Sequence, residues 1–90
     1  MSTVDDTRVP RLKPLFRFQW EPAQSAHVLL YPEGMVKLSG SAGEVLKRVD
    51  GTRDVATIIA ELKALFDNAP LDDDVRNFLA QAEGNGWITF

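Results

Sequence analysis

The clearest hydrophobic pattern lies in the second half of the chain, between Gly51 and Pro70. Six apolar residues recur there at helical spacing, which places them on one face of a helix. They are Val55, Ile58, Ile59, Leu62, Leu65 and Phe66. Asp54 precedes this run, and its carboxylate can cap the helix by accepting a backbone N–H of the first turn. The pattern predicts an amphipathic helix whose apolar face must pack on other segments.

The same periodicity predicts one helix before this segment and one after it. The earlier helix carries Ala42, Val45, Leu46 and Val49. Its cap is either Ser39 or Ser41, the latter forming a capping box with Glu44. The later helix carries Leu71, Val75, Phe78, Leu79 and Ala82. Glycines at positions 84 and 86 favour its termination, and we expect the four residues after them to close the core.

The first half of the chain has the alternating pattern of strands. Aromatic residues alternate with polar ones over residues 15–20, and residues 26–31 and 35–38 are two further short apolar segments. Short turns join the three, which is typical of an antiparallel meander. Residues 1–14 are polar with two prolines, so we expect an irregular tail. Residues 15–90 are then expected to form a single domain.

The predicted fold class is therefore α+β, a three-stranded antiparallel sheet followed by three helices. Three short helices with tight turns also fit a winged helix-turn-helix-like packing. We expect the central helix, residues 55–66, to lie against the strand face that carries Phe16, Phe18 and Trp20. That contact would form the main core of the domain.

Composition narrows the classes of function. The formal net charge of −3 disfavours binding to a phosphate backbone, and the absence of cysteine excludes disulfides and thiolate zinc sites. No apolar run approaches the roughly 20 residues that span a bilayer. The start of the chain lacks the pattern of a secretion signal. We expect a cytoplasmic protein with no membrane partner.

Candidate catalytic residues lack the partners that chemistry requires. His27 is the single histidine, and no serine has a histidine and a carboxylate arranged as a triad by the sequence pattern. The consecutive carboxylates of residues 72–74 splay around a helix start, whereas a metal needs converging ligands. We therefore expect no enzyme activity, no cofactor and no metal site.

A small winged-helix DNA-binding regulator is the alternative function, because three helices of this kind invite it. The helix that would enter the groove is acidic, however, with four carboxylates against one arginine, so nucleic acid is not an expected partner. An interaction module is favoured instead. The third strand, residues 35–38, is short and lies at the edge of the meander, where an added peptide strand can pair with it.

The motifs of the chain resemble those of one family over nearly its whole length. They are RFQWE (17–21), VLLYPEGMVKLSGSAGEVL (28–46), VDGTRDVATIIAEL (49–62) and QAEGNGWI (81–88). The pattern is similar to the pyrroloquinoline quinone biosynthesis protein D family, whose wider relatives are precursor-peptide recognition domains. The resemblance implies a non-enzymatic peptide chaperone. Such a protein binds the leader of the precursor peptide and presents it to a radical S-adenosylmethionine enzyme.

The resemblance also implies where the peptide binds, namely along the third strand and beside the third helix. The matching strand positions are Met35, Val36, Lys37 and Leu38. The matching helix positions are Val75, Arg76, Phe78, Leu79 and Ala82. A short edge strand and hairpin joined by tight turns also favour a homodimer formed by strand or hairpin exchange.

Overall fold

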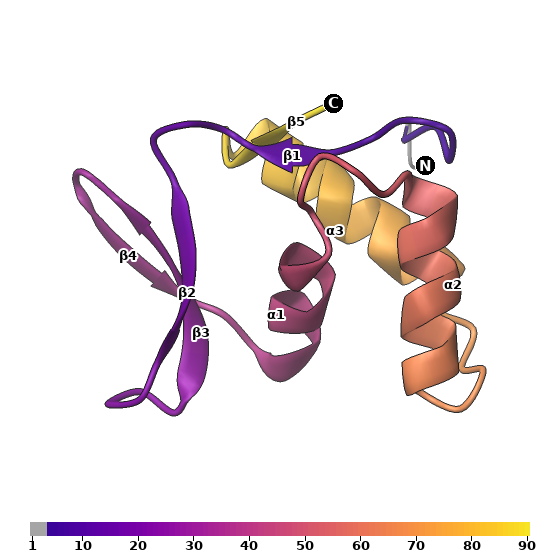
Figure 1. Ribbon diagram of the computed structural model, residues 1–90, viewed down its shortest axis with the longest axis horizontal. Helices are drawn as coiled ribbons and strands as arrows, with labels where there is room; N and C mark the ends of the chain where they lie inside the picture. Colours follow the sequence, from indigo (N-terminus) through magenta and orange to yellow (C-terminus); the bar gives the residue numbers. More distant parts are fainter. Residues whose placement is uncertain (1–3) are drawn as a thin grey trace.

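The computed structural model describes residues 4–90, which form a three-stranded sheet, three helices and a pair of two-residue strands (Figure 1). The elements are β1 Arg11–Leu12, β2 Arg17–Glu21, β3 Ala26–Tyr31, β4 Gly34–Lys37, α1 Gly40–Lys47, α2 Val55–Leu65, α3 Asp72–Gly84 and β5 Ile88–Thr89. The predicted α+β class, with a three-stranded antiparallel sheet before three helices, is confirmed. The winged helix-turn-helix likeness stays a prediction.

The sheet is antiparallel in the order β2-β3-β4, so β4 is one of its two edges. Side chains of directly opposite residues share a face. Phe18, Leu29 and Val36 therefore point to the same side, and Leu29 is fully buried there. The next row, which includes Leu30 and Met35, points to the outer side, and Met35 is 44% exposed. The inner side of the sheet is the one that joins the core.

Side-chain caps fix where the first two helices begin. Ser39 Oγ accepts a hydrogen bond from the Ala42 N–H at 3.2 Å, which decides between the two candidate serines for α1. Asp54 Oδ1 accepts from the Thr57 N–H at 2.8 Å, as predicted for α2. Because Ser39 follows β4 by one intervening residue, α1 must begin immediately beside the sheet.

This short connection makes α1 the helix that meets the sheet. It packs on β3, whereas α2 packs on α1 and α3 and lies farther from the sheet (Figure 1). The expectation that residues 55–66 pack on the strand face of Phe16, Phe18 and Trp20 is therefore wrong. Trp20 is 54% exposed, and Leu62 is buried among the helices instead. The core runs from Leu29 on the sheet to Leu79 on α3.

Gly43 allows α1 to approach the sheet closely. A Cβ at this position would lie 3.1 Å from Nδ1 of His27 on β3. The His27 ring is itself held between two aromatic rings, stacked on Phe18 at a centroid distance of 4.7 Å and edge-on to Trp20 at 5.2 Å. A side chain at position 43 therefore has to displace a packed ring. By contrast, a Cβ at Gly40 meets no atom within 4 Å.

We expect Gly43→Ala to lower the free energy of unfolding by about 1 kcal/mol. Alanine favours a helix over glycine by roughly 1 kcal/mol, but forcing atoms into a packed site typically costs about 1–3 kcal/mol. Gly40→Ala is the matched control and should stabilise by up to about 1 kcal/mol. Urea denaturation of both variants measures the difference. A Gly43→Ala variant more stable than the wild type would show that His27 moves aside.

The segment before β2 is bonded into the fold, which corrects the expectation of an irregular tail over residues 1–14. Strand β1 pairs with β5, and the fully buried Pro10 accepts a hydrogen bond from the Gly51 N–H at 3.1 Å. The carbonyl oxygens of Arg8 and Asp6 accept from backbone N–H groups at the start of α2, at 3.0 and 2.9 Å. The first three residues lie outside the described part.

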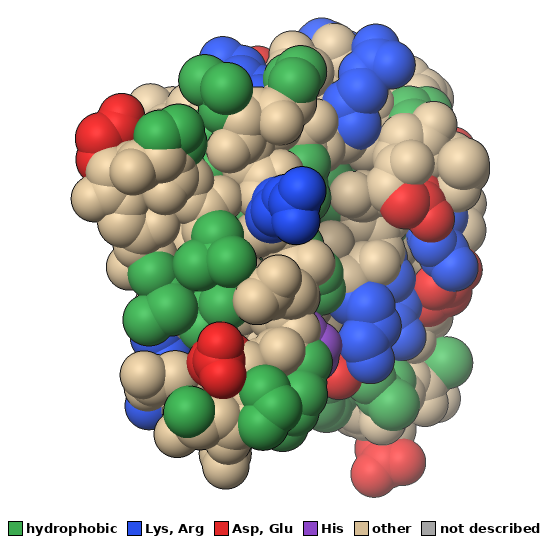
Figure 2. Space-filling model, turned by 60° about the vertical axis from the view of Figure 1, so that its left-hand side comes forward, with side chains coloured by type: hydrophobic (Ala, Val, Ile, Leu, Met, Phe, Trp, Pro, Cys, Tyr) green, Lys and Arg blue, Asp and Glu red, His purple; other side chains and the backbone are tan. Residues whose placement is uncertain are grey.

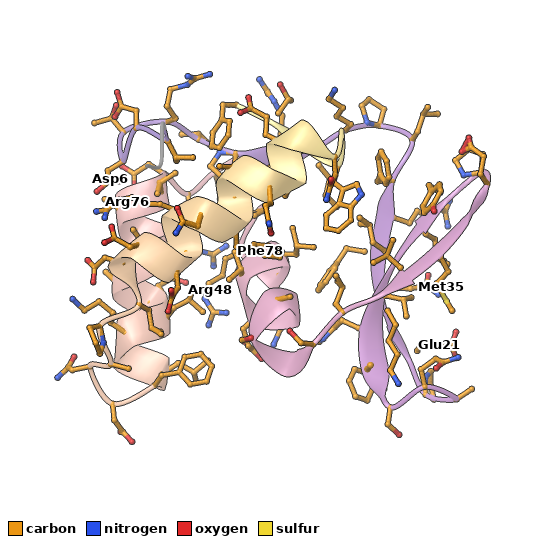
Figure 3. The ribbon with its side chains drawn as sticks, turned by 180° about the vertical axis from the view of Figure 1, so that it is seen from behind. Asp6, Glu21, Met35, Arg48, Arg76 and Phe78 are labelled. Atoms are coloured by element: carbon orange, nitrogen blue, oxygen red, sulfur yellow. The ribbon has the colours of Figure 1, made fainter. Side chains whose placement is uncertain are left out.

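An ion pair between Asp6 and Arg76 joins this segment to α3. The two carboxylate oxygens of Asp6 accept from Nε and Nη2 of Arg76, both at 2.8 Å (Figure 3). This bidentate pair lowers the pKa of Asp6, because the guanidinium stabilises the ionised carboxylate. A lowered pKa in the folded state stabilises the protein above the ordinary aspartate pKa of about 4. The contribution is lost as pH falls through the folded-state pKa.

We expect Asp6→Asn to lower stability at pH 7 and to make it less sensitive to acid. The variant should lose less stability between pH 5 and pH 3 than the wild type, because one of the titrating ion pairs is absent. Denaturant unfolding at several pH values measures this change. Glu33→Gln, at the exposed turn between β3 and β4, removes an equal charge and serves as the control. Equal acid sensitivity in all three proteins would contradict the role of the pair.

Candidate functional site

Strand β4 offers peptide groups to solvent along its free edge. The Leu38 N–H donates to the His27 carbonyl at 3.0 Å, so this pair of opposite residues is a hydrogen-bonded one. Bonded and non-bonded pairs alternate along antiparallel strands. Val36 lies two residues earlier and opposite Leu29, so its backbone N–H and C=O also point toward β3. The backbone groups of Met35 and Lys37 point to the open edge, where an added strand can bond to them.

An apolar groove of about 470 Å³ lies between the helices that follow this strand. Its first lining residue, Ser39, lies two positions after the last residue of β4. The groove runs between the start of α1, the end of α2 and the start of α3. Apart from Ser39 and Ser41, its lining residues are Ala42, Val45, Leu62, Phe66, Leu71, Asp74, Val75 and Phe78. Figure 3 shows Phe78 on α3, where that helix passes α1.

The groove has a mostly apolar wall and a few polar groups at its rim. Phe66, just after α2, is 40% exposed, and so presents an aromatic surface to solvent. The Ser39 hydroxyl is occupied as the α1 cap and lies 3.4 Å from the Ser41 hydroxyl. This arrangement suits an apolar side chain with polar backbone beside it, which is how peptides occupy such clefts.

Of the three aspartates at the start of α3, two form ion pairs and the third lines the groove. Asp72 Oδ1 lies 3.1 Å from Nζ of Lys63, and Asp73 Oδ1 lies 3.0 Å from Nη1 of Arg76. The pKa of Asp72 is lowered, chiefly by its hydrogen bond with Lys63. Asp74 is the one that lines the groove, and it forms no ion pair within residues 4–90.

The residues implied by the family resemblance separate into three groups. Met35, Val36 and Lys37 form the edge strand, and Val75 and Phe78 line the groove. Leu38, Leu79 and Ala82 are buried in the core, with exposed fractions of 6%, 0% and 0%. Arg76 points to the N-terminal segment, where it binds Asp6 (Figure 3). The structure thus does not gather the nine residues on one surface.

The sequence-based list lacks the groove residues of α1 and α2. Those residues are Ala42, Val45, Leu62 and Phe66. Each belongs to an apolar helix face that the periodicity assigns to the core, and a groove wall has the same periodicity. One signal in the sequence is the position of the aromatic Phe66 directly after α2, at the start of the connection to α3.

Two other kinds of site, a membrane-spanning helix and a metal cluster, are absent from residues 4–90. In this range, no helix has the length and apolarity needed to cross a membrane. Nor do three or more histidine, cysteine or carboxylate side chains gather there as a potential metal site. The open edge of β4 and the apolar groove form the candidate site.

Comparison with known proteins gives consistent matches across the chain. The family described as coenzyme PQQ synthesis protein D (PqqD) matches residues 26–88. A PqqA binding protein of Pseudomonas aeruginosa (strain UCBPP-PA14) is 59% identical over 89 residues, covering 98% of this chain and 97% of the relative. A PqqA binding protein of Azotobacter vinelandii is 50% identical over 88 residues, covering 97% and 94%.

A solved structure matches over the same length. It is the solution NMR structure of the PqqD truncation of Methylobacterium extorquens PqqCD. That protein is described as a functional and stand-alone recognition element for ribosomally synthesized and post-translational modified peptides (RiPP recognition element). The two folds superpose with a TM-score of 0.81 at 30% sequence identity. The match covers 99% of this chain and 97% of that chain. The strand and helix order described above is thus shared with a recognition element of known structure.

Proposed function

Because the chain belongs to the coenzyme PQQ synthesis protein D family, we propose that it is a non-enzymatic peptide chaperone that binds the leader of a PqqA-type precursor peptide. The bound leader is then presented to a radical S-adenosylmethionine enzyme, which carries out the chemistry. The names of the relatives support the peptide partner, since they are PqqA binding proteins. The fold of the M. extorquens recognition element supports the same role.

The observation that carries this proposal is an open strand edge, that of β4, followed two residues later in the chain by Ser39, which lines an apolar groove. The leader adds to β4 as an extra strand, bonded to the outward peptide groups of Met35 and Lys37. Beyond Lys37 the peptide passes the turn at Ser39 and enters the groove between the helices. Backbone bonds then contribute affinity along β4, and the groove selects an apolar side chain.

The magnitudes favour the groove as the source of specificity. Burying one large apolar side chain contributes about 1.5–3 kcal/mol, whereas a typical hydrogen bond contributes about 0.5–1.5 kcal/mol net. Backbone bonds along β4 accept almost any sequence, since every residue except proline has the same donor and acceptor. An apolar residue placed to reach Phe66 and Phe78 distinguishes one peptide from another.

Presentation to an enzyme requires surface that the peptide leaves free. The outer face of the sheet, with Leu30 and Met35 in one row, lies on the opposite side from the helices and their groove. Figure 2 shows hydrophobic side chains gathered over the sheet end of the molecule, with Lys and Arg side chains among them. A leader bound along the edge of β4 and in the groove leaves this face available for contact with the enzyme.

Titration of isotope-labelled protein with the precursor peptide tests the proposal. We expect chemical-shift changes at β4, at Ser39–Ser41 and at the groove residues of α3, with saturation at one peptide per chain. Duplex DNA at two salt concentrations is the second titrant. Saturable, salt-dependent binding of DNA without a response to the peptide would overturn the chaperone role in favour of a DNA-binding regulator.

The homodimer formed by strand or hairpin exchange stays a prediction. The segments that would exchange are the edge strand β4 and the hairpin that joins it to β3. Sedimentation velocity over a range of concentrations measures whether a second species forms. A monomer throughout that range counts against the exchange.

A further inference from the structure

The groove is apolar along its wall, but one of its lining residues, Asp74, is acidic. Asp74 is exposed at its edge, on the first turn of α3, beside Val75. Ser39 and Ser41, at the start of α1, are the other polar residues that line the groove, and they hold no formal charge. A peptide side chain that fills the groove therefore has a carboxylate as its nearest charged neighbour among the lining residues.

Asp74 differs from the two aspartates beside it. Lys63 lies close to the Asp72 carboxylate and Arg76 to that of Asp73, so each of those negative charges has a cation within 3.1 Å. Asp74 has no such partner within residues 4–90, although it stands on the same helical turn. The helix dipole favours all three carboxylates alike, so it does not explain why one of them borders the groove.

We propose that Asp74 selects a cationic side chain of the leader, placed within about two residues of the apolar side chain that fills the groove. The inference rests on the proposed function and specifies its ligand. An extended peptide rises about 3.3 Å per residue, and a lysine or arginine side chain spans a further two residues at most. A cation farther along the peptide would not reach the rim while the groove is occupied.

This contact would let the protein discriminate between peptides by the charge of one residue. Pairing a cation with Asp74 beside an apolar wall is stronger than pairing in open water, since the wall excludes solvent from one side. An acidic residue at the same place in the leader meets like charge, from Asp74 and from the overall net charge of −3. A peptide with the right apolar residue and the wrong neighbouring charge is thereby rejected.

Isothermal titration with a matched pair of variants tests the inference. Asp74→Asn removes the proposed contact, and Asp73→Asn removes the same charge one residue away without touching the groove. Each protein is titrated with the precursor peptide and with peptides in which single lysine or arginine residues are replaced by glutamine. We expect Asp74→Asn to weaken binding about three- to tenfold at low salt, less at high salt, and Asp73→Asn by less than about twofold.

The peptide series identifies the partner of Asp74. One glutamine replacement should weaken binding to the wild type as much as Asp74→Asn does, and should cause no further loss in that variant. Wild-type affinity in Asp74→Asn, equal losses in both variants, or additive losses for every peptide position would overturn the inference. A wild-type protein that does not bind the precursor peptide overturns the proposed function itself, and the inference with it.

Discussion

Lys37→Pro is expected to abolish binding of the precursor peptide and to leave the protein folded. Proline removes the backbone N–H, and its ring occupies the space in which an added strand must lie. The Lys37 N–H points to the free edge of β4, so no bond to β3 is lost. The loss of one hydrogen bond to the bound peptide, together with the steric block, should reduce the affinity by tenfold or more.

Val36→Pro should instead destabilise the fold. The Val36 N–H faces β3, where its removal leaves a carbonyl of Leu29 without a partner inside the fold. An unsatisfied buried acceptor costs about 1–3 kcal/mol, and the inner side of the sheet loses the packing of Val36 as well. Thermal unfolding followed by circular dichroism should show a lowered melting temperature for this variant.

Lys37→Ala is the control that separates backbone from side chain. It keeps the outward N–H and removes the charge, so it should bind far better than Lys37→Pro. Calorimetric titration of each folded variant with the precursor peptide gives the affinities. Unchanged affinity in Lys37→Pro would mean that the peptide does not pair with β4, and the proposed mode of binding would be wrong.

The helices can be predicted from the sequence because the residues that specify each of them are close together in the chain. Apolar residues at helical spacing and a capping carboxylate at Asp54 specify α2 within a few residues. The edge position of β4 follows from the order of three short strands. The direction of each N–H along that edge does not follow, because it depends on which opposite pair is hydrogen-bonded. A single contact, Leu38 to His27, fixes it.

The N-terminal segment and the packing order could not be predicted, because both depend on contacts between distant residues. Strand β1 has two residues and no alternation, and its partners are distant in sequence: it pairs with β5, which follows α3, and Arg11 also pairs with Asp50. The bond between Asp6 and Arg76 joins positions 70 residues apart. Likewise, the position of α1 between the sheet and α2 results from the short connection at Ser39.

Periodicity also cannot separate a groove wall from a core, and Leu79 shows this most clearly. The family resemblance places it among the peptide-binding residues, yet it is fully buried in the structure. Phe66, with 40% of its surface exposed, is counted with the core by its spacing and lines the groove. Both residues lie on the apolar faces of their helices, so only the three-dimensional structure shows that Phe66 lines the groove and Leu79 does not.

Leu79→Ala and Phe66→Ala should therefore separate stability from binding. Truncating a fully buried leucine typically costs about 2–5 kcal/mol, a large part of the roughly 5–15 kcal/mol that stabilises a small domain. Leu79→Met, which nearly conserves volume, should cost less than about 1.5 kcal/mol. Phe66→Ala should lose much less stability than Leu79→Ala, but bind the peptide about tenfold more weakly, since the groove loses an aromatic wall.

Urea unfolding and calorimetric titration of the same three variants give both quantities. The titration of Leu79→Ala is made at low temperature, where the folded fraction is measured in parallel and used to correct the affinity. After this correction Leu79→Ala should bind as the wild type does, because Leu79 contributes no surface to the groove. A corrected loss larger than that of Phe66→Ala would place the peptide deeper between the helices than the groove, with α3 opened to admit it.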